Sequence, residues 1–197
     1  TAITLSGQLS IRWIENKLNQ FINKSLETND DYVIGSDTDS IYLNLGPLIH
    51  KFVPKEKSVD NVIRIMDKLC EDKIQPYIDK SYTELAGYVN AYQQKMQMKR
   101  EALADKGIWT AKKRYILRVY NNEGVQYNEP DIKVTGMEMV KSSTPQVVRD
   151  NMKDLIKVIL NGNEKEVHKF IDDFKETFKK QKTDETFKKY TNRLNIV

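Results

Sequence analysis

Ser36-Asp37-Thr38-Asp39-Ser40-Ile41 lies between two short apolar runs, Tyr32-Val33-Ile34 and Ile41-Tyr42-Leu43. Both runs are rich in β-branched and aromatic residues, so each predicts a strand, and the small polar residues between them predict a tight turn. The expected structure is a β-hairpin with Asp37 and Asp39 at its tip. Because residues i and i+2 of a strand point to the same side, the two carboxylates are expected to lie together.

Two neighbouring carboxylates repel each other unless a cation lies between them. Hard oxygen ligands favour Mg²⁺ or Mn²⁺, and carboxylate-bound Mg²⁺ serves phosphoryl and nucleotidyl transfer. Three other interpretations of this turn compete with a metal site. Most Asp-x-Asp turns only cap backbone N–H groups. An EF-hand loop starting at Asp37 needs Gly and Glu where this chain has Tyr42 and Leu48. Glycosidase carboxylates normally come from separate segments.

The composition is that of a folded protein with a heavily charged exterior: 197 residues, 39% hydrophobic, 30% charged and a net charge of +4. One cysteine excludes a disulfide framework and a cysteine-based zinc cluster, and it favours a reducing, intracellular compartment. No apolar stretch approaches the roughly 20 residues of a membrane span. The first residue is Thr1, which suggests a fragment, a processed product or a trimmed chain.

The periodicity predicts an α+β fold, in which an antiparallel sheet with the carboxylate hairpin is backed by long helices and followed by a helical segment. After the hairpin, Gly46-Pro47 predicts a break and a polar loop. The other expected elements are a helix over 2–26, a helix from the N-cap Ser58 to about 86 that Pro76 kinks or interrupts, strands over 96–102, 109–120 and 132–135 with a turn at 121–124, a helix from Thr144-Pro145 to 161, and a helix over 164–182.

Positive charge is concentrated in the window from Lys95 to Arg118. Its eight basic residues stand against two acidic ones and are Lys95, Lys99, Arg100, Lys106, Lys112, Lys113, Arg114 and Arg118. Within the predicted strand, alternation sends Lys113 and Tyr115 to one side and Lys112 and Arg114 to the other. A desolvated cation there needs an anion, such as a nucleic-acid phosphate. The competing interpretation is an edge strand whose lysines discourage aggregation. This strand is expected in the same sheet as the hairpin.

The motifs taken together resemble those of family B DNA polymerases. Asp37-Thr38-Asp39-Ser40, followed by Ile41-Tyr42, resembles the DTDS motif of the palm, and Lys112-Lys113-Arg114-Tyr115 resembles the KKRY motif that tracks the primer–template duplex. Lys99-Arg100-Glu101-Ala102 resembles a palm strand. Thr1-Ala2-Ile3-Thr4 and Lys141-Ser142-Ser143-Thr144-Pro145 resemble the replicative polymerases of large tailed bacteriophages. Two departures stand out: Gly35-Ser36 replaces the family's Tyr-Gly, and Lys99 stands where the phage enzymes tend to have an acidic residue.

The resemblance implies roles for particular residues. Asp39 would be the main ligand of two Mg²⁺ ions, which Mn²⁺ can replace, with Asp37 beside them. Thr38 and Ser40 would fix the turn, and Glu101 would lie near the active centre. Lys113 would approach the minor groove near the primer terminus. The remaining supporting residues are Lys112, Arg114 and Tyr115, which would hold the duplex, and Lys141, Ser142 and Ser143 at the start of the thumb.

The resemblance also implies a division into palm, 1–140, and the beginning of the thumb, 141–197. The family's other catalytic aspartate, the nucleotide-gripping fingers and the exonuclease would lie upstream, in the same gene or on a separate chain. The expected activity is template-directed nucleotidyl transfer from a dNTP to a primer, with primer–template DNA as partner, in the cytoplasm of an infected bacterium and without a membrane. The isolated chain is expected to be inactive. The alternative is a non-catalytic module that binds duplex DNA or docks to a partner chain.

Overall fold

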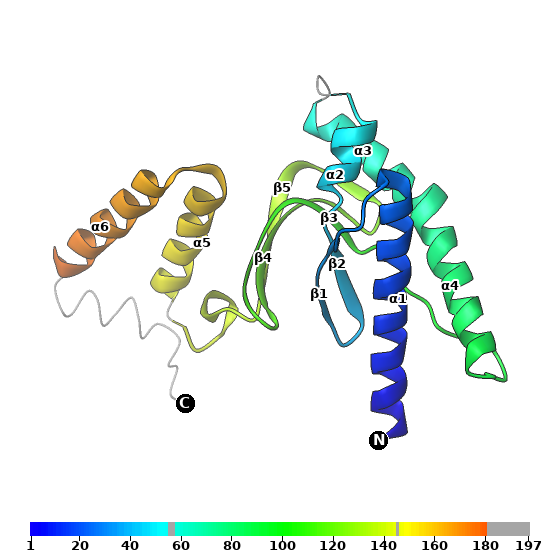
Figure 1. Ribbon diagram of the computed structural model, residues 1–197. Coiled ribbons are helices and arrows are strands. Elements are labelled where there is room, and N and C mark those ends of the chain that lie inside the picture. The colour runs from blue at the N-terminus through cyan, green and yellow to red at the C-terminus, as the bar shows by residue number, and fades with distance from the viewer. Residues whose placement is uncertain (55–57, 145, 181–197) are drawn as a thin grey trace. The chain divides into compact units, whose positions relative to one another are not determined.

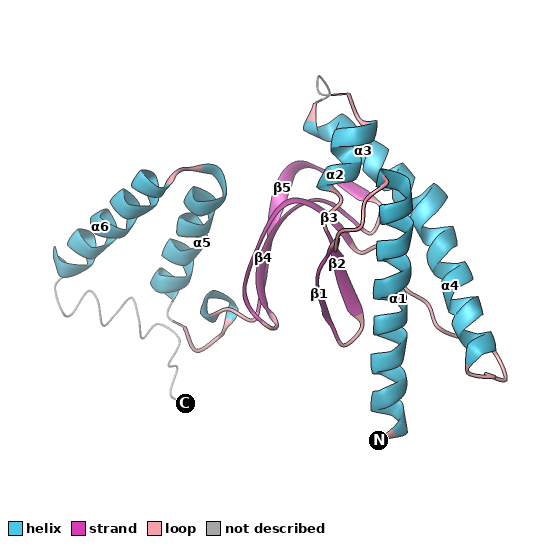
Figure 2. Ribbon diagram, viewed as in Figure 1, coloured by secondary structure: helices cyan, strands magenta, loops and turns pink. Residues whose placement is uncertain are grey.

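The computed structural model describes residues 1–54, 58–144 and 146–180 as an α+β protein with long helices and two small sheets (Figures 1 and 2). Contacts divide the chain into two compact units. Unit 1 comprises residues 1–105 and 119–131, and unit 2 comprises residues 106–118 and 132–197. The division falls within the three strands of the larger sheet, whereas the predicted palm–thumb boundary at 140/141 is functional and stays a prediction. Over the described residues, no helix is both long and apolar enough to cross a membrane.

The first element, α1, spans Ala2–Leu26 and confirms the helix predicted from its apolar spacing. It ends at Glu27, which adopts the left-handed conformation (φ 60°) and donates its N–H to the Asn23 carbonyl. Its buried face begins only at Ser10 and continues through three apolar residues, Ile14, Leu18 and Ile22. The apolar residues of the first turns of α1 are solvent-exposed: Ile3, Leu5 and Leu9.

The predicted hairpin is confirmed as β1, Val33–Asp37, paired antiparallel with β2, Ser40–Leu43. It forms a two-stranded sheet of its own, so the expectation that it shares a sheet with the basic strand is wrong. Its apolar residues Ile41 and Leu43 pack instead against the helical core of unit 1. Where a polar loop was expected, the chain forms α2, Gly46–Phe52, because Pro47 lies at the helix start, where a missing N–H costs nothing.

The long helical segment of unit 1 is interrupted just before Pro76. Helix α3, Val59–Leu69, begins at the predicted cap Ser58, whose side chain accepts from the Asn61 N–H at 3.4 Å. A π-helical turn over Cys70–Ile74 follows, and α4, Gln75–Tyr88, completes the segment. Pro76 has no N–H to donate and its ring clashes with the carbonyl four residues back, so the wider turn is the physical form of the predicted interruption.

The core of unit 1 joins α1, α3 and α4 to the first strand of the larger sheet. Figure 1 shows α1 beside α4. Ten buried residues form this core: Ile14, Leu18, Ile63, Met66, Cys70, Ile74, Ile78, Tyr82, Leu85 and Leu103. Burial raises the pKa of the Cys70 thiol to about 11, so this residue serves as a core side chain. A smaller cluster, in which Ile22, Tyr32 and Leu48 are buried together, fixes the entry to the hairpin and α2.

The larger sheet has three strands in the order β3, Ala102–Ala111; β4, Arg114–Asn122; and β5, Val125–Thr135. The predicted turn between β4 and β5 is confirmed, with Glu123 (φ 50°) and Gly124 (φ 87°) both in the left-handed region that two-residue hairpin turns favour. Pro130 lies inside β5, which is acceptable because β5 is an edge strand.

Unit 2 contains the remaining helices: a 3₁₀ turn η2 over Glu138–Val140, α5 over Gln146–Asn161 and α6 over Glu164–Lys180. Its core consists of Ile116, Met139, Ile156 and Leu160. Both helices were predicted and η2 was not. The proposed helix start at Thr144-Pro145 involves residue 145, outside the described residues, as does the predicted end of the last helix at 182.

Candidate functional site

The carboxylate hairpin turns through only two residues, Thr38 and Asp39, because Asp37 pairs directly with Ser40. The register continues with Ser36 opposite Ile41, then shifts between Val33 and Gly35. This irregularity gives the short hairpin an extra residue on β1. Gly35 has open space beside it, since a Cβ there would meet nothing within 4 Å. The position where the family has tyrosine could therefore accommodate a larger side chain.

The two carboxylates occupy different parts of the tip. Asp37 is the last residue of β1 and half-buried, and its Oδ1 accepts from the Thr38 N–H at 2.8 Å and the Thr38 hydroxyl at 3.2 Å. Asp39 lies in the turn and is exposed. The period of a strand, which predicts that residues i and i+2 point to one side, does not extend to Asp39 because Asp39 lies in the turn after β1. Both printed bonds of Thr38 go to the preceding residue, Asp37, and the role of Thr38 in fixing the turn stays a prediction.

The donor set at the tip fits part of a divalent-cation site. Both groups are hard carboxylate oxygens, which Mg²⁺ prefers, and Asp39 presents its carboxylate to solvent. Within the described residues no group of three or more His, Cys, Asp or Glu side chains is arranged to hold a metal. Asp37 and Asp39 could therefore act as ligands together with groups from elsewhere.

The basic segment is a hairpin tip rather than a continuous strand, so the predicted alternation of its cations is wrong. β3 ends at Ala111, Lys112 and Lys113 form the turn, and β4 begins at Arg114. Lys113 adopts the left-handed conformation, with φ 61°. Two consecutive residues in a tight turn cannot follow the period of a strand, which is why the pattern misled. All of Lys112, Lys113 and Arg114 are exposed.

Aromatic packing between β3 and β4 supports this basic hairpin next to its turn. The Trp109 and Tyr115 rings lie 6.4 Å apart between centroids, tilted by 34°. Gly107 makes room for this arrangement, because a Cβ there would lie 2.6 Å from the Trp109 ring. Tyr115 is consequently half-buried, a support of the hairpin rather than a fully exposed contact.

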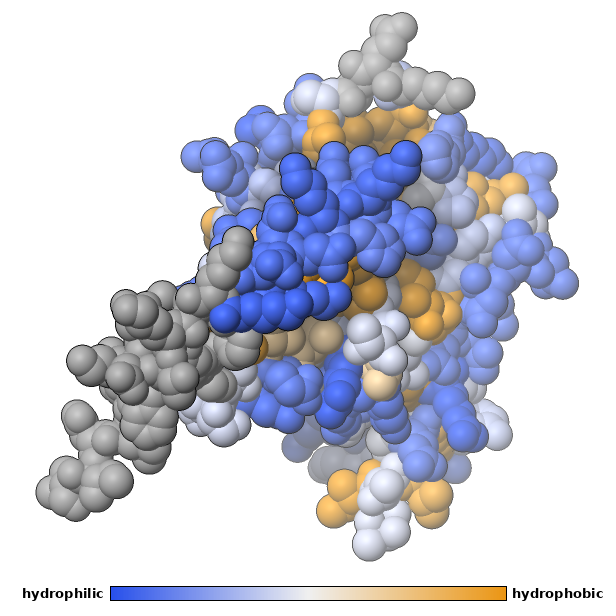
Figure 3. All heavy atoms as spheres, turned by 90° about the vertical axis from the view of Figure 1, so that its left-hand side faces the viewer, coloured by the Kyte–Doolittle hydropathy of each residue, from blue (hydrophilic) through white to orange (hydrophobic). Residues whose placement is uncertain are grey.

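Several cations of the basic window are bound within the protein, and this weakens the inference that they need an external anion. Lys106 Nζ donates to the Leu160 carbonyl at 2.6 Å, and the Arg118 guanidinium donates to the Asn161 side chain, so both hold the carboxyl end of α5. Arg100 and Arg114 also have acidic partners. Lys112 shows no side-chain partner over the described ranges. The face drawn in Figure 3 is mostly hydrophilic, with smaller apolar patches.

Residues 99–101 were expected in a palm strand, but β3 starts only at Ala102. Polar groups of residues 98–100 bind to helices instead: the Met98 carbonyl accepts from Gln75 Nε2 of α4 at 2.9 Å, and the Arg100 guanidinium donates to Asp67 of α3. Glu101 is exposed, and its carbonyl accepts from the Glu123 N–H at 2.6 Å, which ties it to the β4–β5 turn. Its predicted place near an active centre stays a prediction.

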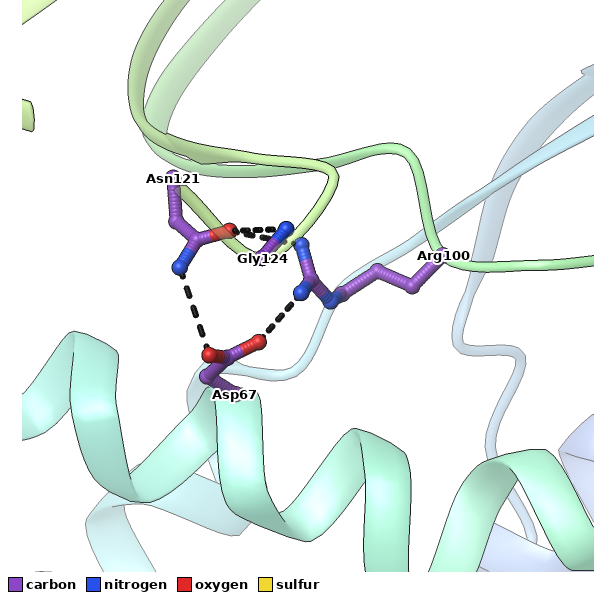
Figure 4. Close-up of polar contacts among 4 residues, drawn as sticks. All are labelled: Asp67, Arg100, Asn121 and Gly124. Atoms are coloured by element: carbon purple, nitrogen blue, oxygen red, sulfur yellow. Dashed lines mark hydrogen bonds and ion pairs between the residues drawn. The ribbon is translucent and has the colours of Figure 1, made fainter. Parts of the chain in front are cut away.

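A partly buried polar network around Arg100 was not predicted from the sequence (Figure 4). Arg100 pairs with Asp67 of α3, and its Nη1 donates to Asn121 Oδ1 at 2.8 Å. Asn121 Oδ1 also accepts from the Gly124 N–H at 3.1 Å, while its Nδ2 donates to Asp67 Oδ2 at 3.3 Å. The available signal was Asn121 itself, a polar residue at a position where the strand pattern faces inward.

The polar junction after β5 is organised by Glu138. Lys141 Nζ lies 3.1 Å and Arg114 Nη2 lies 3.7 Å from Glu138 Oε1. The bond from Lys141, the Glu138 backbone N–H and the charges of Lys141 and Arg114 hold the pKa of Glu138 below its ordinary value. Ser142 and Ser143 are exposed in a turn. The structure thus brings together two predicted site residues, Arg114 and Lys141, in unit 2, whereas Asp37 and Asp39 belong to unit 1.

Comparison with known proteins assigns the family. A family model described as Divergent Family B DNA polymerase matches residues 13–183. The chain is 37% identical over 189 aligned residues to the DNA-directed DNA polymerase of Enterobacteria phage T4, covering 91% of the chain and 21% of the relative. It is 38% identical over 174 residues to that of Escherichia phage RB69, covering 83% and 19%. The chain belongs to the divergent family B DNA polymerases, and it spans about one fifth of the length of these curated relatives.

Proposed function

We propose that this chain forms part of the palm and the beginning of the thumb of a DNA-directed DNA polymerase. The reaction is attack of a primer 3′-hydroxyl on the α-phosphate of a template-matched dNTP, with pyrophosphate leaving. Family membership supports the reaction class, since two relatives bear the name DNA-directed DNA polymerase. The observation that carries the proposal is the pair Asp37 and Asp39 at the tip of a two-residue β-hairpin.

Asp39 is proposed as the principal metal ligand and Asp37 as its neighbour. Two Mg²⁺ ions, or Mn²⁺ in their place, supply Lewis-acid activation of the hydroxyl and neutralise charge on the triphosphate when bound. Asp39 is exposed in the turn and presents its carboxylate to solvent. Asp37 Oδ1 accepts from the Thr38 N–H and hydroxyl, which restrains this carboxylate beside Asp39.

Other parts of the enzyme are needed for this chemistry. A second aspartate segment, the fingers and the exonuclease are proposed to come from the remainder of the polymerase, in the same gene or on a separate chain. The Lys112–Tyr115 hairpin is proposed to hold primer–template DNA. Because catalysis by two metals needs carboxylates from both sources, the 197-residue chain alone should not extend a primer.

The test is Asp39→Asn in a polymerase reconstituted from this chain and the remainder of the enzyme. Loss of one metal ligand should lower primer extension at least about a hundred-fold, the scale on which a preorganised charged group acts in a transition state. Asp30→Asn is the matched control, because Asp30 is exposed in the loop before β1 and its side chain has no partner in the described segments. Its extension rate should stay near that of the unchanged chain.

The rival is a non-catalytic module that binds duplex DNA or docks to a partner, with both aspartates serving as turn caps. It predicts that Asp39→Asn retains synthesis, and that result would reject the catalytic proposal. Extension by the isolated chain at a rate near the reconstituted enzyme would instead reject its dependence on other segments. The docking variant is favoured by one observation: the apolar side chains of Ile3 and Leu5 are 86% and 65% exposed on α1.

A further inference from the structure

Glu138 is an isolated negative charge in a strongly basic part of the chain. The stretches 106–118 and 132–149 both belong to unit 2. Together they hold one acidic residue, Glu138, against eight basic residues, which are Lys106, Lys112, Lys113, Arg114, Arg118, Lys133, Lys141 and Arg149. A carboxylate in such a field lowers the local positive potential that any polyanion would meet.

Two of these cations converge on a single oxygen of Glu138. Arg114 comes from the first position of β4 and Lys141 from the segment after η2, yet their side-chain nitrogens lie 3.7 Å and 3.1 Å from Glu138 Oε1. All three side chains are 49% exposed, so the meeting point is open to solvent. A guanidinium and an ammonium around one anionic oxygen is the arrangement that a phosphate oxygen also uses.

The backbone holds this meeting point in place. The Glu138 carbonyl accepts from the Thr144 hydroxyl at 2.6 Å and the Lys141 N–H at 3.1 Å, which fixes the junction around η2. Gly136 lies against the basic turn, since a Cβ there would overlap the Lys113 carbonyl and come within 3.3 Å of Arg114 Cγ. The basic hairpin and the junction therefore present Arg114 and Lys141 as one surface.

The ion pairs themselves are easily exchanged. Salt bridges between half-exposed side chains contribute little to stability, because water solvates the charges about as well as the partner does. Replacing the Glu138 carboxylate with a phosphate keeps both cations paired and requires only that Glu138 turn to solvent. An external phosphodiester can thus compete for Arg114 and Lys141 at small cost.

We propose that Arg114 and Lys141 form a binding site for a backbone phosphate of duplex DNA, which Glu138 occupies as an internal substitute when DNA is absent. This inference rests on the proposed role of the basic hairpin in holding primer–template DNA. Glu138 then weakens binding in two ways. It competes for the cations, and once displaced it is an unpaired carboxylate that takes up a counterion while the DNA releases its own.

The test is the affinity of the full 197-residue chain for a short fluorescent duplex, measured by anisotropy from about 50 to 200 mM salt. Glu138→Gln should tighten binding about five-fold at the lowest salt, since it removes an unfavourable charge near the phosphate. The slope of log affinity against log salt should become more negative by about 0.9, the value of one additional net counterion. Circular dichroism should confirm that both proteins are equally folded.

Glu129→Gln is the matched control. Glu129 is exposed on β5 and its side chain has no partner in the described part of the chain, so the substitution changes net charge equally. The duplex affinity of this variant should change at most about two-fold, because Glu129 is an exposed residue that pairs with neither Arg114 nor Lys141. A second comparison places Arg114→Gln or Lys141→Gln on the Glu138→Gln background, where each should remove the gain in affinity.

Equal effects of Glu138→Gln and Glu129→Gln would overturn the inference, as would a gain that survives loss of Arg114 and Lys141. Absence of duplex binding by every variant would overturn it too, and so would tightening toward polyglutamate without tightening toward DNA. None of these results decides the catalytic proposal, which depends on primer extension by the Asp39→Asn enzyme. Failure of the phosphate site and failure of the polymerase assignment are therefore distinguishable.

Discussion

At the scale of single residues, Arg100 connects the helices of unit 1 to its sheet. Asn121, only 1% exposed, offers both ends of its amide to this connection: its oxygen accepts from Arg100 and Gly124, and its nitrogen donates to Asp67. A buried amide with all these bonds fixes one arrangement of the β4–β5 turn over α3. Removing one partner would leave the others unpaired in a largely dry site.

We expect Arg100→Gln to lower the free energy of unfolding by about 1.5 to 3 kcal/mol, the range for hydrogen bonds to charged groups. The Arg100 and Asp67 side chains are only 16% and 22% exposed, so water replaces the lost bonds poorly. Urea unfolding followed by circular dichroism measures the change. Arg64→Gln, at an exposed position of α3, the helix that carries Asp67, should alter stability by less than about 0.5 kcal/mol. Equal losses in the two variants would show that the network is not stabilising.

At the scale of elements, the basic hairpin depends on a glycine that is remote in sequence. Gly136 follows β5 with φ 68°, and any Cβ there would overlap the Lys113 carbonyl in the turn between β3 and β4. Both the backbone conformation and the close approach therefore require glycine. This residue keeps the hairpin tip beside the junction that carries Glu138 and Lys141.

Gly136→Ala should destabilise the protein by about 2 kcal/mol, within the range for a strained backbone position. It should also weaken duplex binding, because the turn that carries Lys112 and Lys113 must shift. Thermal unfolding and anisotropy measure the two effects. Gly87→Ala is the control with the opposite expectation: Gly87 lies in α4 with nothing within 4 Å of a new Cβ, so alanine should stabilise the helix by about 0.5 to 1 kcal/mol. A stable, tightly binding Gly136→Ala protein would contradict the account.

The elements predicted well from sequence are those whose pattern is local and long. Three signals were each contained within a short stretch of sequence. They are the apolar spacing of α1, the N-cap Ser58 and the turn at residues 121–124. The predictions were wrong where contacts with residues remote in sequence determine the local structure. Residues 99–101 alternate as a strand does, but Arg100 binds α3 instead. Lys112 and Lys113 follow a strand-like segment that contains Trp109, yet they form a turn.

The candidate site was likewise predictable where its signal is local and not where it depends on remote contacts. The hairpin and its two aspartates were predictable because strand, turn and strand occur within twelve residues, Tyr32 to Leu43. The convergence of Arg114 and Lys141 on Glu138 was not, since it requires β4 and the segment after η2 to meet. The hydrophobic periodicity of a sequence does not indicate which cation a single glutamate will bind.

At the scale of the whole molecule, the proposed chemistry is divided between separately compact units and further segments. Asp37 and Asp39 lie in unit 1, and the basic hairpin lies in unit 2. The chain spans about one fifth of the phage polymerases to which it is similar. The proposed enzyme therefore brings its carboxylates, its DNA-holding cations and its nucleotide-binding parts together from segments far apart in sequence.

The most direct measurement of the central claim is anomalous scattering from manganese in crystals of this chain with the remainder of the polymerase, primer–template DNA and a matching dNTP. Mn²⁺ takes the same oxygen ligands as Mg²⁺. The account predicts an anomalous peak within coordination distance of the Asp39 carboxylate, lost in the Asp39→Asn protein. A complete ternary complex with manganese bound elsewhere, and none beside the Asp37–Asp39 tip, would contradict it.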